Sequence, residues 1–159
     1  MQIPLELPAD LARIDLVYRE HSHRLFRSLL AYTGDRVIAE DAMAEAFAQA
    51  LRRGPALRQP ERWVWRAAFR IAAGWLKDRE RYTVSGVEPS YELDEVSPVL
   101  REALATLPVG QRAAVILHYY ADLSTSDVAA VLGSTGPAVR VALMRARRRL
   151  RTLLETPDG

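Results

Sequence analysis

An arginine-rich segment near the C-terminus is the part of the chain whose residue types and spacing best suit a chemical task. Six of the twelve residues from 140 to 151 are arginine, at positions 140, 145, 147, 148, 149 and 151. The planar guanidinium group matches phosphate oxygens and the acceptor edge of guanine. Apolar residues recur at helical spacing in the same segment, namely Val139, Leu143, Ala146 and Leu150. The segment predicts a helix with one buried face and one cationic face.

The residues before this segment predict a helix-turn-helix. Helices are expected over 125–132 and 136–154, because Ser124 can cap the first and Thr135 the second, with Gly133 in the turn. In that layout the second helix enters the major groove of duplex DNA. Candidate base or sugar contacts are Arg140, Val141, Met144 and Arg145, and candidate phosphate contacts are Arg147 and Arg148. The competing interpretation is a solvated terminal helix without a ligand.

A second cationic segment, 60–81, carries aromatic side chains among its basic ones. The aromatic residues are Trp63, Trp65, Phe69 and Trp75, and the basic ones are Arg62, Arg66, Arg70, Lys77, Arg79 and Arg81. Unpaired bases can stack on such rings while the cations neutralise phosphates. Some of the rings must belong to the core at helical spacing. We expect Trp65, Ala68, Phe69 and Ala72 inside, and Trp63 or Trp75 exposed.

An acidic amphipathic helix is predicted around 39–47, where Glu40, Asp41 and Glu45 lie near one edge. A partly apolar, acidic face is suited to docking a protein partner. Solvated acids explain the same spacing equally well.

Composition excludes several classes of chemistry. The 159 residues contain no cysteine, which removes disulfides, thiolate metal sites and cysteine nucleophiles. His21 and His23 lie two apart and cannot share a helical face, and no phosphate loop or nucleophile–base set occurs, so neither a metal nor a cofactor is expected and no enzyme activity is predicted. Without a long apolar run or a signal peptide, we expect a cytoplasmic protein with no membrane insertion.

The placement of charge is more informative than the net charge of +2. Lys and Arg number 14 against 11 acids in 1–81, 1 against 5 in 82–106, and 7 against 4 in 107–159. Arginine supplies 21 of the 22 basic side chains, a bias that a GC-rich genome also explains. Basic residues therefore predominate in the first and last parts of the chain, and acidic residues predominate in the middle.

Helical periodicity without alternating strand patterns predicts an all-α fold of two small domains. Two or three helices are expected within 11–53, broken at Gly34-Asp35, and another from about residue 59 to 81. Residues 82–97 mix Gly, Pro, Ser and acids, which is typical of a linker. Helices are then expected near 98–107, 109–121, 125–132 and 136–154. The predicted domains are 11–81 and 98–154.

With both halves considered, the chain resembles the extracytoplasmic-function (ECF) group of RNA polymerase sigma factors, over about residues 13–152. In the first half the similarity rests on Gly34-Asp35, Ala39-Glu40-Asp41, Glu45-Ala46-Phe47 and Trp63-Val64-Trp65-Arg66-Ala67-Ala68. In the second half it rests on Leu107-Pro108, Gln111-Arg112, Leu117-His118-Tyr119-Tyr120, Val128-Ala129-Ala130-Val131-Leu132-Gly133 and Arg145-Ala146-Arg147-Arg148-Arg149-Leu150. The chain departs from the family's usual residues at Ala44, Leu51, Arg70, Gly74 and Val141.

The resemblance implies a sigma factor that directs core polymerase to specific promoters and initiates transcription, with promoter DNA, RNA polymerase core and an anti-sigma factor as partners. It implies polymerase binding by Glu40, Asp41, Ala44, Glu45 and Phe47. It implies contacts to the −10 element from Arg62, Trp63, Arg66, Arg70, Trp75, Lys77 and Arg79, and to the −35 element from Thr135, Arg140, Val141, Met144, Arg145, Arg147 and Arg148. The alternatives are a divergent sigma-like regulator that does not initiate transcription, and a dimeric helix-turn-helix repressor.

Overall fold

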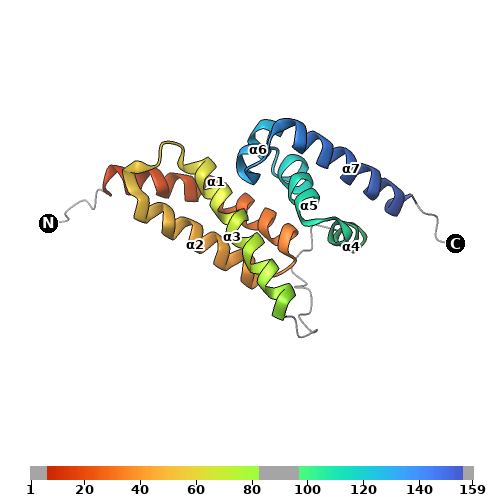
Figure 1. The fold of residues 1–159 in the computed structure, drawn as a ribbon. Coiled ribbons are helices and arrows are strands. Elements are labelled where there is room, and N and C mark those ends of the chain that lie inside the picture. The colour runs from red at the N-terminus through yellow and green to blue at the C-terminus, as the bar shows by residue number, and fades with distance from the viewer. Residues whose placement is uncertain (1–6, 83–96, 156–159) are drawn as a thin grey trace.

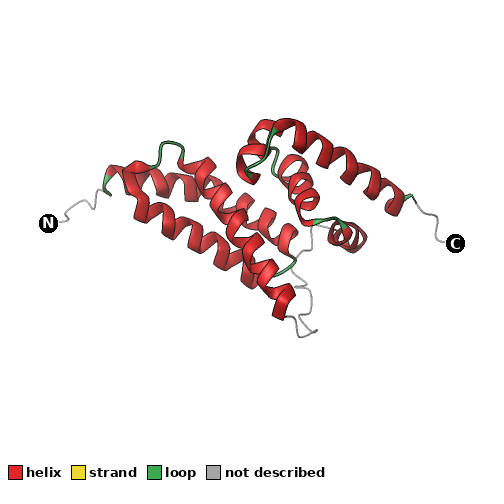
Figure 2. Cartoon of the chain, in the orientation of Figure 1, coloured by secondary structure: helices red, strands yellow, loops and turns green. Residues whose placement is uncertain are grey.

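Helices form every regular element within 7–82 and 97–155, the two ranges that this computed structural model describes (Figure 2). No strand occurs in those ranges, which confirms the predicted all-α class. The predicted linker, 82–97, falls almost entirely outside the described residues.

The first group of helices comprises α1 (Ala9–Thr33), α2 (Arg36–Arg53) and α3 (Pro60–Tyr82), with a short 3₁₀ turn, η1 (Gly54–Ala56), before α3. The predicted break at Gly34-Asp35 is confirmed. Gly34 has a φ of +65° and donates its N–H to the carbonyl of Leu30 at 2.8 Å, while Asp35 caps α2 by accepting from Ile38 N at 3.1 Å. Left-handed backbone at this position suits glycine, so the chain reverses here without strain.

These three helices pack on one another along their lengths (Figure 1). The four residues of α3 that were expected inside are all buried, namely Trp65, Ala68, Phe69 and Ala72. Small side chains such as Ala39, Ala42 and Ala46 on α2 are fully buried, which lets the helix axes come close together. The buried face of α3 leaves its arginines on the opposite side.

The second group comprises α4 (Pro98–Thr106), α5 (Val109–Val115), a π-helical turn η2 (Ile116–Tyr120), α6 (Thr125–Leu132) and α7 (Gly136–Leu154). The bounds of α6 and α7 agree with those predicted. Ser124 accepts from Asp127 N at 3.1 Å and Thr135 from Ala138 N at 3.3 Å, so both predicted caps are formed.

One predicted helix is wrong in its second half. Residues 109–121 were expected to form a single α-helix, but α5 ends at Val115 and the chain widens into η2, where Ala121 N–H donates to the carbonyl of Ile116 at 3.0 Å. The extra residue in this turn keeps Ile116 and Leu117 buried and leaves Tyr119 and Tyr120 at the surface. Asp122, with a φ of +58°, then leads out of the turn.

The two groups contact each other through α6, which lies against α3, and through α1, which lies against η2. Arg112 of α5 reinforces this contact. Its guanidinium donates to the carbonyls of Leu104 and Leu107 within its own group, at 3.1 and 3.2 Å, and to the carbonyl of Tyr32 in α1 at 3.1 Å. The Arg112 side chain therefore provides hydrogen-bond donors for carbonyl groups at the end of α4 and links the two groups of helices.

No single helix of the described ranges is long and apolar enough to cross a membrane, although α6 and α7, bent by 101° at their break, pass that test as a pair.

Candidate nucleic-acid interface

The turn between α6 and α7 sets the direction of the cationic helix. Gly133 adopts a left-handed φ of +64° and its N–H bonds to the carbonyl of Ala129, which ends α6. Thr135 then caps α7, with Pro137 in its first turn. The predicted inward face is confirmed, because Val139, Leu143 and Ala146 are buried and Leu150 packs against the core. The helix is thus anchored by one face.

The remaining faces of α7 carry the predicted contact residues at the surface. Arg140, Arg145, Arg147 and Arg148 are all exposed. Val141 and Met144 are 42% and 45% exposed, so apolar atoms stand among the guanidinium groups. Such a mixture can meet both guanine acceptors and thymine methyl groups. Thr135 is exposed at the helix N-terminus, next to the first of these residues.

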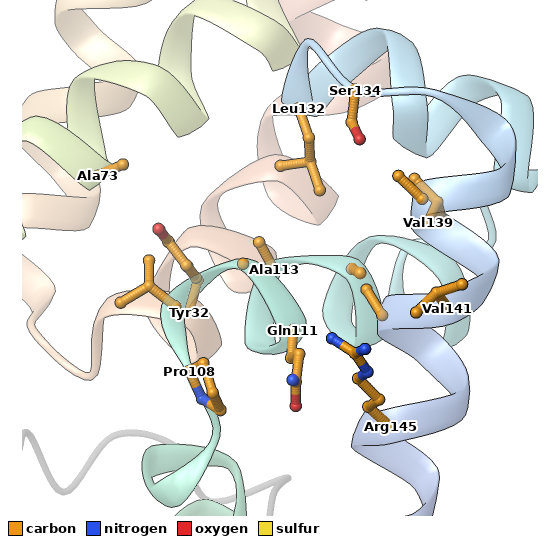
Figure 3. Close-up of a pocket in the computed structure, with 15 residues that line it drawn as sticks. Tyr32, Ala73, Pro108, Gln111, Ala113, Leu132, Ser134, Val139, Val141 and Arg145 are labelled. Atoms are coloured by element: carbon orange, nitrogen blue, oxygen red, sulfur yellow. The ribbon is translucent and has the colours of Figure 1, made fainter.

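A cavity of about 700 Å³ opens beside this helix (Figure 3). The cavity is lined by Val141 and Arg145 of α7 and Gln111 of α5. On its other side it is lined by Tyr32 and Ala73 of the first group of helices. The part of the α7 surface that carries Val141 and Arg145 therefore faces α1 and α3 across this cavity.

The arginines of α3 form a stripe, because Arg62, Arg66 and Arg70 follow at four-residue intervals and are exposed. The stripe faces α6. Arg62 donates to the Asp127 carboxylate at 2.9 Å, a Cβ on Gly133 would lie 3.5 Å from Arg66 Nη2, and Arg70 lines a cavity of about 250 Å³ with Leu132. The second group of helices therefore lies beside three of the cations that were expected to meet single-stranded DNA, although all three remain exposed.

The other predicted residues of α3 differ in their surroundings. Trp75 is 37% exposed and Lys77 is exposed, which leaves both side chains accessible. Trp63 is half-buried, with the Arg53 guanidinium 5.1 Å from its ring centre. Arg79 donates to Asp35 at 2.9 Å, so it holds the residue that caps α2. The contact with Asp35 gives Arg79 a structural role.

The acidic face of α2 is already engaged in part by neighbouring cations. Glu40 pairs with Arg36 at 2.9 Å. Glu45 accepts from Gln49 at 2.9 Å and from Arg52 at 3.1 Å, and these hydrogen bonds, the one from Gln49 foremost, lower the pKa of its carboxyl group. The carboxylate of Glu45 is therefore held ionised and oriented at the surface.

The remaining residues of that predicted surface divide between surface and core. Asp41 and Ala44 are exposed, and Leu51, which was not among the predicted contacts, is 46% exposed on the same helix. Phe47 is only 7% exposed and packs edge-on against Tyr18, with ring centres 5.1 Å apart. Phe47 therefore lies in the core beneath this surface and supports α2.

Sequence reasoning missed the role of Asp127 as the partner of Arg62. Ser124 was expected to cap α6, and it does so by accepting from Asp127 N. The carboxylate of Asp127 contacts Arg62 of α3. An acidic side chain in the first turn of α6 is the signal that could have drawn attention to this contact. Within the described ranges, no cluster of three or more His, Asp or Glu residues could hold a metal ion.

Comparisons with known proteins show which sequences the chain is similar to. Residues 98–150, which include α4 to most of α7, match the family model described as "Sigma-70, region 4". The chain is 30% identical over 166 residues to the ECF RNA polymerase sigma factor SigL of Mycobacterium tuberculosis, covering 92% of each protein. It is 27% identical over 159 residues to the RNA polymerase sigma-E factor of Streptomyces antibioticus, covering 94% of this chain and 88% of that protein.

Two solved structures share the fold. The structure of CnrH in complex with the cytosolic domain of CnrY superposes with a TM-score of 0.70 at 21% identity, covering 95% of this chain and 92% of that one. The sigma factor RpoE of Bartonella quintana, in complex with the anti-sigma factor NepR, gives 0.69 at 20% identity, covering 92% of this chain and 97% of that one. Both superpositions extend over the two helix groups.

Proposed function

Because the chain belongs to the ECF RNA polymerase sigma factors, we propose how its helices divide the work of directing core polymerase to a promoter. Residues 11–81 form the polymerase-binding and −10 domain, 82–97 the linker, and 98–154 the −35 domain. RNA synthesis itself belongs to the polymerase, so this chain contributes binding rather than catalysis. Its place of action is the cytoplasm, where the polymerase works.

The exposed arginine face of α7 is the observation that carries the proposal. Arg140, Arg147 and Arg151 follow at intervals of seven and four residues and share one edge, whereas Arg145 and Arg149 share the other. A helix in the major groove has a phosphate strand along each edge and bases below its crest. Thr135, Val141, Met144 and Arg148 lie at the cap or between those edges. We assign −35 recognition to this helix.

The −10 element is assigned to α3. Trp63 and Trp75 offer rings for unpaired bases, while Arg62, Arg66, Arg70, Lys77 and Arg79 supply the cations. Arg62 is paired with Asp127 and Arg79 with Asp35, so these carboxylates compete with phosphate for the two cations. The accessible side chains, Trp75 and Lys77, are the first points of contact.

Polymerase docking is assigned to the exposed edge of α2. Asp41 and Ala44 present an accessible surface, flanked by the carboxylates of Glu40 and Glu45, which bond to Arg36 and to Gln49 respectively. Phe47 supports the helix from the core. The fold neighbour RpoE was solved in complex with the anti-sigma factor NepR, so an anti-sigma factor is the further partner that we propose.

The proposal is tested by in vitro transcription with purified core polymerase and genomic fragments as template. Arg140→Ala and Arg145→Ala should each weaken promoter binding about tenfold, the loss of one arginine contact to the DNA, and leave core binding intact. Asp41→Ala should weaken core binding and leave the melting temperature unchanged, because its side chain is exposed. Arg19→Ala removes an arginine side chain that is 75% exposed on α1 and serves as the control for DNA binding.

Promoter-specific transcripts that depend on the chain support the proposal. A chain that binds core polymerase but yields no such transcripts contradicts it, and identifies a sigma-like regulator instead. Equal loss of DNA binding and core binding in the α7 variants would refute the division between the two domains.

A further inference from the structure

Tyr119 makes a long-range contact to the cationic helix that the assigned DNA surface does not include. Its hydroxyl accepts a hydrogen bond from Nη1 of Arg147 at 2.6 Å, across 28 residues of sequence. The side chain is 51% exposed, so its burial does not account for its position. Tyr119 therefore touches the outside of α7 from a neighbouring element.

The π-helical turn determines where Tyr119 points. Within η2, Ile116 and Leu117 are 2% and 0% exposed, which anchors the turn in the core. The bond from Ala121 N–H to Ile116 O replaces the ordinary helical pairing and closes the wider turn. Since Ile116 and Leu117 are held inside, Tyr119 and Tyr120 at the end of the turn project outward.

His118 braces the same ring. Its Nδ1 donates to the carbonyl of Leu123 at 2.8 Å, which ties the imidazole to the chain leaving the turn. The imidazole then meets the Tyr119 ring edge-on, with ring centres 4.8 Å apart and planes at 74°. The Tyr119 side chain is thus held by two contacts, from His118 to its ring and from Arg147 to its hydroxyl.

We infer that Tyr119 is a positioning residue for duplex DNA binding, which holds the Arg147 guanidinium at one edge of α7, ready for a phosphate. A free arginine side chain loses rotamer freedom when it binds, and a side chain already held in place loses less. The hydroxyl is an acceptor, so it directs one N–H of Arg147 and leaves the charge and the other donors available. This inference rests on the proposed role of α7.

The test compares hydroxyl removal with arginine removal in the full-length chain. Fluorescence anisotropy would measure binding to random-sequence DNA duplexes about two helical turns long. Arg147→Ala should weaken binding about tenfold and lower the slope of log affinity against log salt by about one. Tyr119→Phe keeps the ring and its contact with His118, and should weaken binding about threefold with an unchanged melting temperature.

A double-mutant cycle separates positioning from a general effect on the fold. Tyr119→Phe should have no further effect in the Arg147→Ala background. Combined with Arg145→Ala, at the opposite edge of the helix, it should add its full threefold effect. Tyr120→Phe, which removes the hydroxyl of the adjacent exposed tyrosine, should bind as the unaltered chain does.

Unchanged binding by Tyr119→Phe, or a full further loss in the Arg147→Ala background, overturns the inference and leaves the DNA role of α7 standing. The inference is also overturned, and the DNA role of α7 stands, if Arg140→Ala weakens DNA binding but Arg147→Ala does not. If none of the arginine variants alters binding, the inference and the proposed role of α7 both fail.

Discussion

At the scale of single residues, His21 shows how a buried contact depends on a proton. Trp65 donates its indole N–H to Nδ1 of His21 at 3.3 Å, and Arg24 Nη2 lies 3.3 Å from the same nitrogen. Both neighbours are donors, so Nδ1 must be unprotonated. Burial, and then the charge of Arg24, lower the pKa of His21 below 6.5, against the opposing charges of Glu20 and Glu61. The fold is built around the neutral imidazole.

This arrangement predicts a loss of stability in mild acid. With its folded-state pKa below 6.5, His21 is protonated first in the unfolded chain as the pH falls, so its contribution is present above about pH 6.5 and declines below it. The melting temperature should be lower at about pH 5.5 than at about pH 7.5, and His21→Gln should reduce this difference. His23→Gln, at an exposed position of the same helix, is the matched control. An equal drop in both variants would contradict the assignment.

At the scale of secondary-structure elements, the start of α2 depends on α3. Oδ1 of Asp35 accepts from Ile38 N at 3.1 Å, and Oδ2 accepts from Arg79 Nη1 at 2.9 Å. The Asp35 side chain is 12% exposed and that of Arg79 is 36% exposed, so water screens this pair only in part. Three helices therefore meet at one carboxylate, because Asp35 also follows the end of α1.

Stability measurements should reveal this coupling. Asp35→Ala removes both the cap and the ion pair, and should cost about 2 kcal/mol of unfolding free energy, whereas Arg79→Ala should cost about 1 kcal/mol. In the double variant the loss should match that of Asp35→Ala alone. Lys77→Ala, at an exposed position two residues away, should change stability by less than about 0.5 kcal/mol. Additive losses would show that Arg79 does not act through Asp35.

At the scale of the whole molecule, α6 lies over the arginine stripe of α3. The Arg62–Asp127 pair joins residues 65 positions apart, and their side chains are 56% and 36% exposed. The Asp127 carboxylate neutralises the charge of the Arg62 guanidinium, which weakens the attraction of this side chain for a phosphate. Asp127 and a nucleic-acid phosphate would thus compete for Arg62 in this arrangement.

Releasing that pair should favour single-stranded DNA. Asp127→Asn leaves the backbone cap at Ser124 intact and should raise the affinity of the full-length chain for a single-stranded oligonucleotide about threefold, measured by anisotropy. Asp122→Asn removes an equal charge at an exposed position elsewhere in the same group, and corrects for the general effect of charge. Arg62→Ala should abolish the gain. Equal gains in the two asparagine variants would rule out competition at Arg62.

Local patterns in the sequence determined most of the helices. Val139, Leu143 and Ala146 identified the buried face of α7, and Trp65 and Phe69 that of α3, because helical periodicity depends only on residues three and four apart. The caps at Asp35, Ser124 and Thr135 and the left-handed turns at Gly34 and Gly133 are likewise local. The arginine-rich helix after α6 was predicted from the same short-range rules.

Tertiary structure alone decided which faces meet. Arg62 and Asp127 pair across 65 residues, Trp65 and His21 across 44, and neither spacing leaves a periodic trace in the chain. The π turn at Ile116–Tyr120, which brings Tyr119 to Arg147, also depends on the core that holds Ile116 and Leu117. Periodicity states that a side is buried or exposed. Which helix covers it depends on packing among elements that are distant in sequence.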